Sequence, residues 1–349
     1  VAIYIIAPAL NLAICWDNLF ALIALSQSAG NLFCYNDFGL LRDYTPGIIC
    51  LGILLCVSPN PYKRKFSTSS KSQLGPYLAG IIEGDAHLFV PEYPGKRDSK
   101  NRIIYPSIQI ALHIKDLPLF ILLQKILGHG SISKKTGKSY VYIINNLEGI
   151  LLVIRLVNGF FRTPKINALH RLIDHYNSSG HNIPVLPLDT SPLSSNSWLA
   201  GFIDADGHFS IRYTKLGKYP TRIACAFELE QRQVDISGQS LYDILSFIAQ
   251  LTDSSVKETK KDTPNPKYRV RTVSLKGNLL LISYLSDYPL FSGKHLDYLD
   301  WKEVVTMMQQ GAHLTDSGKL TIQGIKSSIN DGRTEFNWDH LQNFYTLDD

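Results

Sequence analysis

The chain has 349 residues, of which 45% are hydrophobic and 19% are charged. This length suffices for two domains with their own cores, and 15 Phe, 18 Tyr and 4 Trp exclude a disordered chain. Five cysteines are too few for a disulfide scaffold in a chain of this length. The sequence has no Cys-x-x-Cys pair, so a zinc site is not expected. The formal net charge of +5 is compatible with a nucleic-acid partner and equally with an ordinary solvated basic surface.

Residues 1–73 are predicted to be a hydrophobic N-terminal extension and linker. The stretch 44–62 is apolar and uncharged and is followed at once by Lys-Arg-Lys, an arrangement that resembles a membrane segment with a basic flank. Membrane contact through residues 1–60 is one alternative, and an extension that packs on the body or is removed is the other. The Ser/Thr-rich run 65–73 predicts a linker and the first domain boundary.

A short pattern then occurs twice. Residues 78–85 read LAGIIEGD and residues 199–206 read LAGFIDAD, so that the last aspartates, Asp85 and Asp206, lie 121 residues apart. An internal repeat with this period indicates two similar folded units rather than a solenoid. We therefore expect a first domain over residues 74–185 and a second over residues 186–349.

The same succession of elements is predicted after each copy. In the first unit we expect strands at 86–93 and 103–112, a helix at 116–127, strands at 129–134 and 139–145, and helices at 147–158 and 165–177. In the second we expect strands at 207–214 and 221–230, a helix at 235–250, strands at 254–260 and 267–274, and helices at 276–286 and 293–309. The predicted fold class is α+β, with two pseudo-symmetric αββαββα units whose antiparallel sheets leave one face open and together form a saddle.

The repeated pattern suits a close helix pair. Leu-Ala-Gly followed by two aliphatic residues places small side chains on one helix face, where a second backbone can approach. Each helix then ends in an acid, Asp85 or Asp206. Because a helix C-terminus already carries partial negative charge, two such ends with two carboxylates need a cation between them. Hard oxygen ligands select Mg²⁺ or Mn²⁺.

The segments LAGIIEGDA and LAGFIDADG resemble the two signature motifs of the LAGLIDADG homing endonucleases, in the double-motif, single-chain form. The resemblance covers roughly residues 74–310. It implies a monomer with an internal pseudo-two-fold axis that cuts both strands of a long asymmetric DNA target, as in intron homing. By position it also implies that Asp85 and Asp206 hold divalent metal, with the carbonyls of Gly84 and Ala205 adjacent.

Two lysines extend this implied site. The segments 161–165 (FRTPK) and 289–294 (PLFSGK) resemble the family's segment before the last helix of each half, which carries a lysine near the active site. Lys165 and Lys294 would polarise the attacking water or offset phosphate charge. The alternative is a solvent-exposed lysine at a helix start.

Further residues are predicted to lie in or near the site. Gln109 is a candidate water-positioning group, and its partner in the second half is either Glu228 or Glu230. The earlier acids of the motifs, Glu83 and Asp204, match a position that the family uses at the helix interface. Where the second copy has glycine the first has Ala86, whose methyl group we expect to crowd the metal or the DNA.

The DNA surface is predicted on the open sheet faces and their loops, because strand pairs can enter the major groove. Basic residues gather at equivalent loops of both halves, where most would contact phosphate. The predicted nucleic-acid-binding residues are Arg97, Lys100, Arg102, Lys134, Lys135 and Lys138 in the first half, and Arg212, Lys215, Lys218, Arg222, Lys257, Lys260, Lys261 and Lys267 in the second.

The resemblance leaves one alternative function. Some intron-encoded members of the family act as maturases, which bind their own intron RNA and assist its splicing, and the same fold and basic surface would serve that role. Retention of both aspartates and both lysines favours cleavage, although bifunctional members keep them too. The resemblance to intron-encoded members of the family also implies a mitochondrial location.

Overall fold

The computed structural model describes residues 72–93, 95–216 and 219–347. All of them belong to one unit of the chain, residues 69–349. The possible membrane segment, the linker and the boundary at residue 73 depend on residues 1–71, which lie outside the described part. Within the described part, every helix is too short or too polar to cross a membrane.

The first half contains the predicted succession of elements. In chain order they are α5 (Leu74–Asp85), β1 (Ala86–Phe89), β2 (Ser107–His113), α6 (Leu117–Leu127), β3 (Ser131–Lys134), β4 (Ser139–Ile144), α7 (Leu147–Val157) and α8 (Ile166–Asn177). The four strands form an antiparallel sheet in the order β1-β2-β4-β3. Helix α6 ends at Gly128, whose φ of 69° is the left-handed conformation that glycine adopts without strain.

The second half repeats this arrangement. Its elements are α9 (Trp198–Asp206), β5 (Gly207–Leu216), β6 (Tyr219–Arg232), α10 (Tyr242–Leu251), β7 (Val256–Thr259), β8 (Lys267–Arg271), α11 (Leu275–Asp287), α12 (Lys294–Gln309) and α13 (Asp316–Ser328). The strand order β5-β6-β8-β7 matches the first sheet. The predicted α+β fold class with two αββαββα units is confirmed, and α13 is an addition that the sequence did not predict.

The helix predicted at 235–250 begins later, at Tyr242. The carboxylate of Asp235 accepts hydrogen bonds from the backbone N–H groups of Ser237 and Gln239, which closes a turn instead of starting a helix. The proposed division between the halves at residue 185 falls in the segment that joins α8 to α9, and it stays a prediction.

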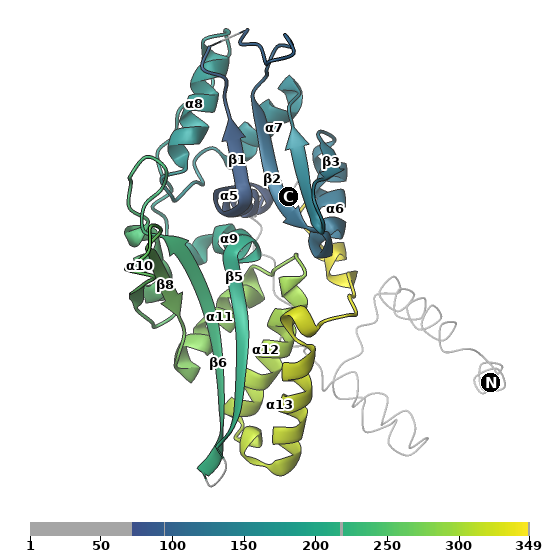
Figure 1. Cartoon of the computed structure of the whole chain (residues 1–349), viewed down its shortest axis with the longest axis vertical. Coiled ribbons are helices and arrows are strands. Elements are labelled where there is room, and N and C mark those ends of the chain that lie inside the picture. The colour runs from purple at the N-terminus through teal and green to yellow at the C-terminus, as the bar shows by residue number, and fades with distance from the viewer. Residues whose placement is uncertain (1–71, 94, 217–218, 348–349) are drawn as a thin grey trace, which may run out of the picture. The chain divides into compact units, whose positions relative to one another are not determined.

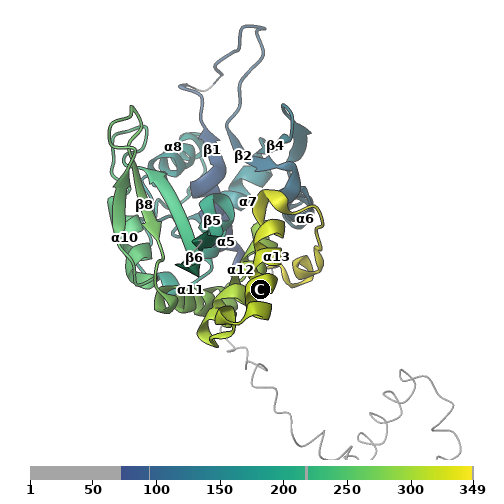
Figure 2. The same ribbon diagram turned by 60° about the horizontal axis from the view of Figure 1, so that its bottom comes forward.

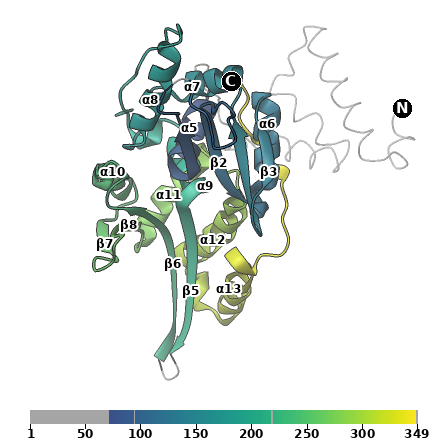
Figure 3. The same ribbon diagram turned by 45° about the horizontal axis from the view of Figure 1, so that its top comes forward.

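Figure 1 shows the two sheets on either side of a central helix pair, α5 and α9. In Figure 2 the loop between β1 and β2 extends away from the body. In Figure 3 the long β5–β6 hairpin extends beyond the rest of its sheet, beside α12 and α13. The motif helices therefore lie at the centre of the described unit, between the two sheets.

Glycine allows the central helices to touch backbone to backbone. A Cβ added to Gly80 would overlap the carbonyl oxygen of Trp198, and one added to Gly201 would overlap that of Tyr77. The two contacts are related by the repeat, since Tyr77 and Trp198 occupy the same position of each motif helix. The small residues of the motif thus set the separation of the two halves.

Alternation along the strands separates a packed face from an open one. On β2 the buried side chains of Ile108 and Ile110 belong to the core, and on β6 those of Phe227 and Leu229 do so. Their neighbours in the chain point to the other face of each sheet. One face of each sheet is therefore available to a partner.

The C-terminal segment after α13 returns to the helix pair. Phe344 is buried with its ring 5.6 Å from that of Tyr77 in the first half and 4.8 Å from that of Phe291 in the second. Earlier in the segment, Arg333 forms ion pairs with Asp297 and Asp300 of α12. The tail thus contacts both halves.

Candidate active site

The two motif aspartates lie together at the C-terminal ends of the helix pair. Asp85 is the last residue of α5 and Asp206 the last residue of α9. A methyl group on Gly84 would lie 3.0 Å from Oδ2 of Asp206 and would overlap the side chain of Ala205. The sequence prediction that these four residues gather at one place is therefore realised in the fold.

The environment of Asp85 opposes its negative charge. Although the residue keeps an exposed surface, loss of hydration around its carboxyl group, and then the charge of Asp206, raise the pKa of Asp85 to about 7. The positive charges of Lys294 and Lys165 act in the opposite direction but do not cancel the effect. Two carboxylates at two negative helix ends thus form a site that favours a bound cation.

This pKa gives a prediction for the metal-free protein. A carboxyl group whose pKa is raised on folding binds more protons in the native state, so stability falls as pH rises from about 4 to about 7. Asp85→Asn should remove that contribution. Urea unfolding in EDTA at pH 5 and pH 8 should show a smaller loss of stability in Asp85→Asn than in wild type, and an equal loss would contradict the assignment.

The two predicted lysines occupy equivalent places beside the motif helices. Nζ of Lys165 donates to the carbonyl oxygens of Ile82 at 3.1 Å and Ala86 at 3.0 Å, and lies 3.5 Å from that of Gly84. Nζ of Lys294 donates to the carbonyl oxygen of Ala205 at 2.5 Å. Neither is therefore a free solvent lysine, because each binds the unpaired carbonyls at the end of its own motif helix.

The earlier acids of the motifs hold the halves together. Glu83 is buried and accepts from the backbone N–H groups of Arg162 and Thr163 in its own half and from Nε1 of Trp198 in the other. Burial raises the pKa of Glu83 to about 7. Its position at the interface is the one that the resemblance implied.

Asp204 repeats this arrangement from the other side. It accepts from the N–H of Phe291 and the hydroxyl of Ser292 in its own half, and from the Tyr77 hydroxyl at 2.7 Å in the other. Burial raises the pKa of Asp204 as well. Removing a donor from such a buried acid costs about 1–3 kcal/mol.

Strand register decides the partner of Gln109. Gln109 pairs with His87, two residues after Asp85, and Glu228 pairs with His208, two residues after Asp206. Glu228, and not Glu230, is therefore the equivalent residue. Gln109 donates to Oγ of Ser107 on the open face of its sheet and is not in hydrogen-bonding contact with either aspartate.

Two residues near the site were missed by the sequence reasoning. Nε2 of Gln231 donates to Oδ2 of Asp206 at 2.8 Å, whereas the register places Leu112 at the equivalent position of the first half. Asp116 of the first half accepts from the N–H of Gly293, just before α12 of the second. The site is consequently asymmetric, and only a strand register could have indicated Gln231.

Ala86 does not crowd the aspartates. Its side chain is buried in the hydrophobic core, 8% exposed, while its carbonyl oxygen accepts from Lys165. The expectation that this methyl group crowds the metal or the DNA stays a prediction.

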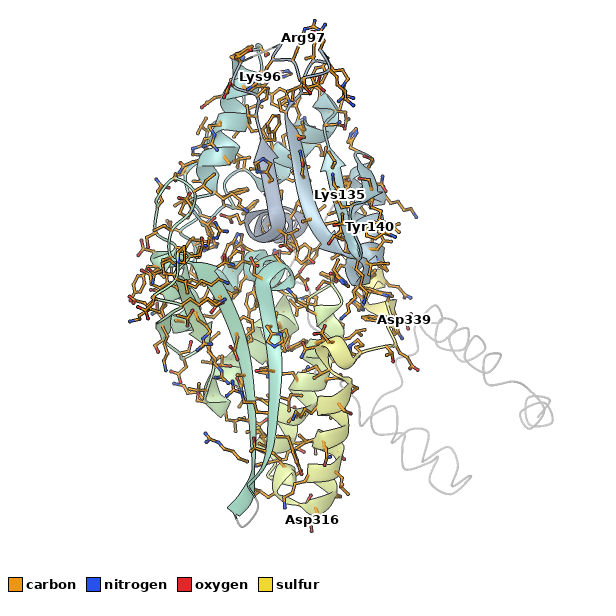
Figure 4. The ribbon with its side chains drawn as sticks, in the orientation of Figure 1. Lys96, Arg97, Lys135, Tyr140, Asp316 and Asp339 are labelled. Atoms are coloured by element: carbon orange, nitrogen blue, oxygen red, sulfur yellow. The ribbon has the colours of Figure 1, made fainter. Side chains whose placement is uncertain are left out.

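The predicted basic residues differ in how they are held. Arg97 lies in the loop beyond one end of the first sheet, and Lys135 lies in the turn between β3 and β4 at the opposite end (Figure 4). Arg102 is paired with Asp98 within its loop, and Lys267 with Glu230 on the second sheet. Exposed members of the predicted set are Arg97, Lys100, Arg102, Lys134, Lys135, Lys138, Arg212, Arg222, Lys257, Lys260 and Lys261. The Lys215 side chain and all of Lys218 lie outside the described part.

Comparison with known proteins agrees with this geometry. The sequence model of the LAGLIDADG endonuclease family matches residues 78–176 and 199–305, so the chain belongs to this family. The intron-encoded DNA endonuclease aI3 of Saccharomyces cerevisiae is 31% identical over 78% of this chain and 73% of its own length. The cox1 intron-2 37.2 kDa protein of Schizosaccharomyces pombe is 30% identical over 86% of this chain and 83% of its own.

Two further similarities bear on fold and partner. The crystal structure of the homing endonuclease I-GzeII in complex with its DNA target covers 74% of this chain and 99% of that one, with 20% identity and a TM-score of 0.58. At this identity the likeness shows the fold. The intron-encoded RNA maturase bI4 of Saccharomyces cerevisiae is 28% identical over 52% of this chain and 25% of its own length.

Proposed function

We propose that the chain is an intron-encoded, site-specific endonuclease that cleaves both strands of a long asymmetric DNA target. The observation that carries this proposal is the placement of Asp85 and Asp206 at the facing ends of two helices in backbone contact, each helix end bound by a lysine. Two carboxylates related by a pseudo-two-fold axis suit a substrate with two strands. The names of the relatives and of the solved structure support DNA as the substrate.

The donor set of this site fits Mg²⁺ or Mn²⁺. Its side-chain donors are the two aspartates. Among the described residues, no cluster of three or more His, Cys, Asp or Glu side chains forms a metal site. The carbonyl oxygens of Gly84 and Ala205 add further hard ligands. When bound, the ion would lower the pKa of water and neutralise charge on the phosphate.

The chain's own groups have separate roles in this proposal. Asp85 and Asp206 hold the cation, and the ammonium groups of Lys165 and Lys294, now on carbonyl oxygens, are within reach of an arriving phosphate. Gln231 orients the carboxylate of Asp206 through its hydrogen bond. Glu83 and Asp204 keep the two helices in register and take no part in the chemistry.

DNA binding should depend strongly on salt. If each half contacts several phosphates, raising salt from about 50 to about 200 mM should weaken affinity roughly 10³-fold or more, because bound counterions are released from DNA. A binding titration in Ca²⁺ or EDTA measures this without cleavage. A nearly flat response would contradict a DNA interface built from the basic loops.

The similarity to an RNA maturase keeps a second function in view: binding to the host intron RNA and assistance with its splicing, alone or beside cleavage. Asp85→Asn separates the two functions, since it should remove cleavage and leave RNA binding unchanged. We further propose a mitochondrial location, which the cox1 intron relative supports. Import or fractionation of the tagged full chain tests that proposal.

A further inference from the structure

The open faces of the two sheets differ in chemistry although their topology is the same. The open positions are fixed by strand register, because paired residues of neighbouring strands share a face. On the first sheet these positions hold His87, Phe89, Ser107, Gln109, Ala111, His113, Ser131, Ser133, Ser139, Val141 and Ile143. None of them is Asp, Glu, Lys or Arg.

The second sheet presents the opposite character. Its open positions hold His208, Ser210, Arg212, Thr214, Arg222, Ala224, Ala226, Glu228, Glu230, Arg232, Lys257, Thr259, Lys267, Arg269 and Arg271. Seven of these fifteen positions are basic and two are acidic, and the two acids, Glu228 and Glu230, are successive open positions of β6. The first sheet has no such charged side chain at its open positions, and Arg97 and Lys135 lie in the loops that flank it (Figure 4).

The charged groups of the second sheet are held in place before any partner arrives. Glu228 pairs with Nε of Arg271 at 3.1 Å and lies 3.6 Å from a terminal nitrogen of Arg269. Glu230 accepts from Nζ of Lys267 at 3.0 Å and from the hydroxyl of Thr259 at 2.8 Å. A guanidinium fixed in this way loses less rotamer entropy on binding a base edge.

These side chains match different base pairs. Arginine binds guanine O6 and N7 with two hydrogen bonds, and glutamate accepts from the cytosine amino group, so the second face suits G·C pairs. Glutamine binds adenine N6 and N7, and apolar side chains contact the thymine methyl group, so Gln109, Ala111 and Ile143, which keep exposed surface, suit A·T pairs.

We infer that the two halves read DNA of different composition: the first sheet an A·T-rich half-site through methyl contacts and Gln109, the second a G·C-containing half-site through Arg269, Arg271 and Glu228. The inference rests on the proposed function, because it requires duplex DNA to lie along both open faces.

Selection from a randomised duplex library, with the full chain in Ca²⁺ buffer, tests this directly. The expected product is a site with one A·T-rich half and one half with fixed guanines. Enrichment of no sequence would overturn the proposed function and the inference together. An enriched site with fixed guanines in both halves would overturn the inference alone.

Base analogues and matched variants then assign the contacts. In the selected site, 7-deazaguanine removes N7, and deoxyuridine removes the thymine methyl group. Deazaguanine should weaken binding about 10-fold per contacted guanine in one half only, and deoxyuridine about 4-fold per contacted thymine in the other half only.

Arg271→Gln and Gln109→Leu are the matched variants, one on each open face. Arg271→Gln should reproduce the deazaguanine loss at one position and show no further loss on the modified site. Gln109→Leu should leave binding at that guanine position unaffected. It should weaken the preference for adenine at one position in the other half. Equal sensitivity of both variants to both analogues would overturn the assignment.

Discussion

Asp206→Asn is expected to reduce double-strand cleavage of the target about a thousand-fold while leaving DNA affinity within a few-fold of wild type. The substitution keeps the shape of the side chain but removes one charged ligand from a site whose cation contributes several kcal/mol to transition-state stabilisation. Affinity persists because the basic loops and open sheet faces are untouched. Asp85→Asn should have the same effect on linear product.

The two variants should differ in residual nicking. Asp206 has the additional hydrogen bond from Gln231, whereas the first half has Leu112 at that position. Nicked plasmid should therefore survive better in Asp85→Asn than in Asp206→Asn. The control is Asp316→Asn, at the far end of α13 (Figure 4). Full linearisation by either motif variant would remove the aspartates from the mechanism.

Gly80→Ala is expected to lower the free energy of unfolding by about 3 kcal/mol or more. The new methyl group would overlap the Trp198 carbonyl oxygen, so the central helices must separate and their aspartates with them. Gly201→Ala should act alike through the Tyr77 carbonyl oxygen. Urea unfolding monitored by far-UV circular dichroism measures both.

Gly324→Ala provides the matched control for these variants. Gly324 lies in α13, and a methyl group added there meets no atom within 4 Å. Since alanine is the better helix former, this variant should be stabilised by up to about 1 kcal/mol. If Gly80→Ala and Gly324→Ala were equally stable, the helix contact would not set the spacing of the halves.

Much of the fold could be predicted because its pattern occurs twice. The duplicated motif fixed the position of Asp85 and Asp206, and alternation and turn residues located most strands and helices. The helix start at Tyr242 was mispredicted because Asp235 competes for backbone N–H groups, a local effect that propensity does not resolve.

The finer geometry of the site needed the strands in register. Counting from the aspartate favoured Glu230 as the partner of Gln109 and counting to the next helix favoured Glu228, and the pairing of Glu228 with His208 decides between them. The hydrogen bond from Gln231 to Asp206 was not predicted for the same reason. The contacts of the C-terminal segment after α13 could not be predicted from the sequence either, because Phe344 packs on Tyr77, which lies more than 250 residues away in the chain.

The central claim is that the paired aspartates direct cleavage of both strands of one DNA target. The most direct measurement is incubation of the wild-type full chain with Mg²⁺ and a supercoiled plasmid that carries the uninterrupted allele of its own insertion site, followed by mapping of the cut on each strand. We expect linear product with one cut on each strand, facing each other across one minor groove. A protein that binds this DNA without cutting it, and that instead accelerates splicing of its intron RNA, would contradict the account.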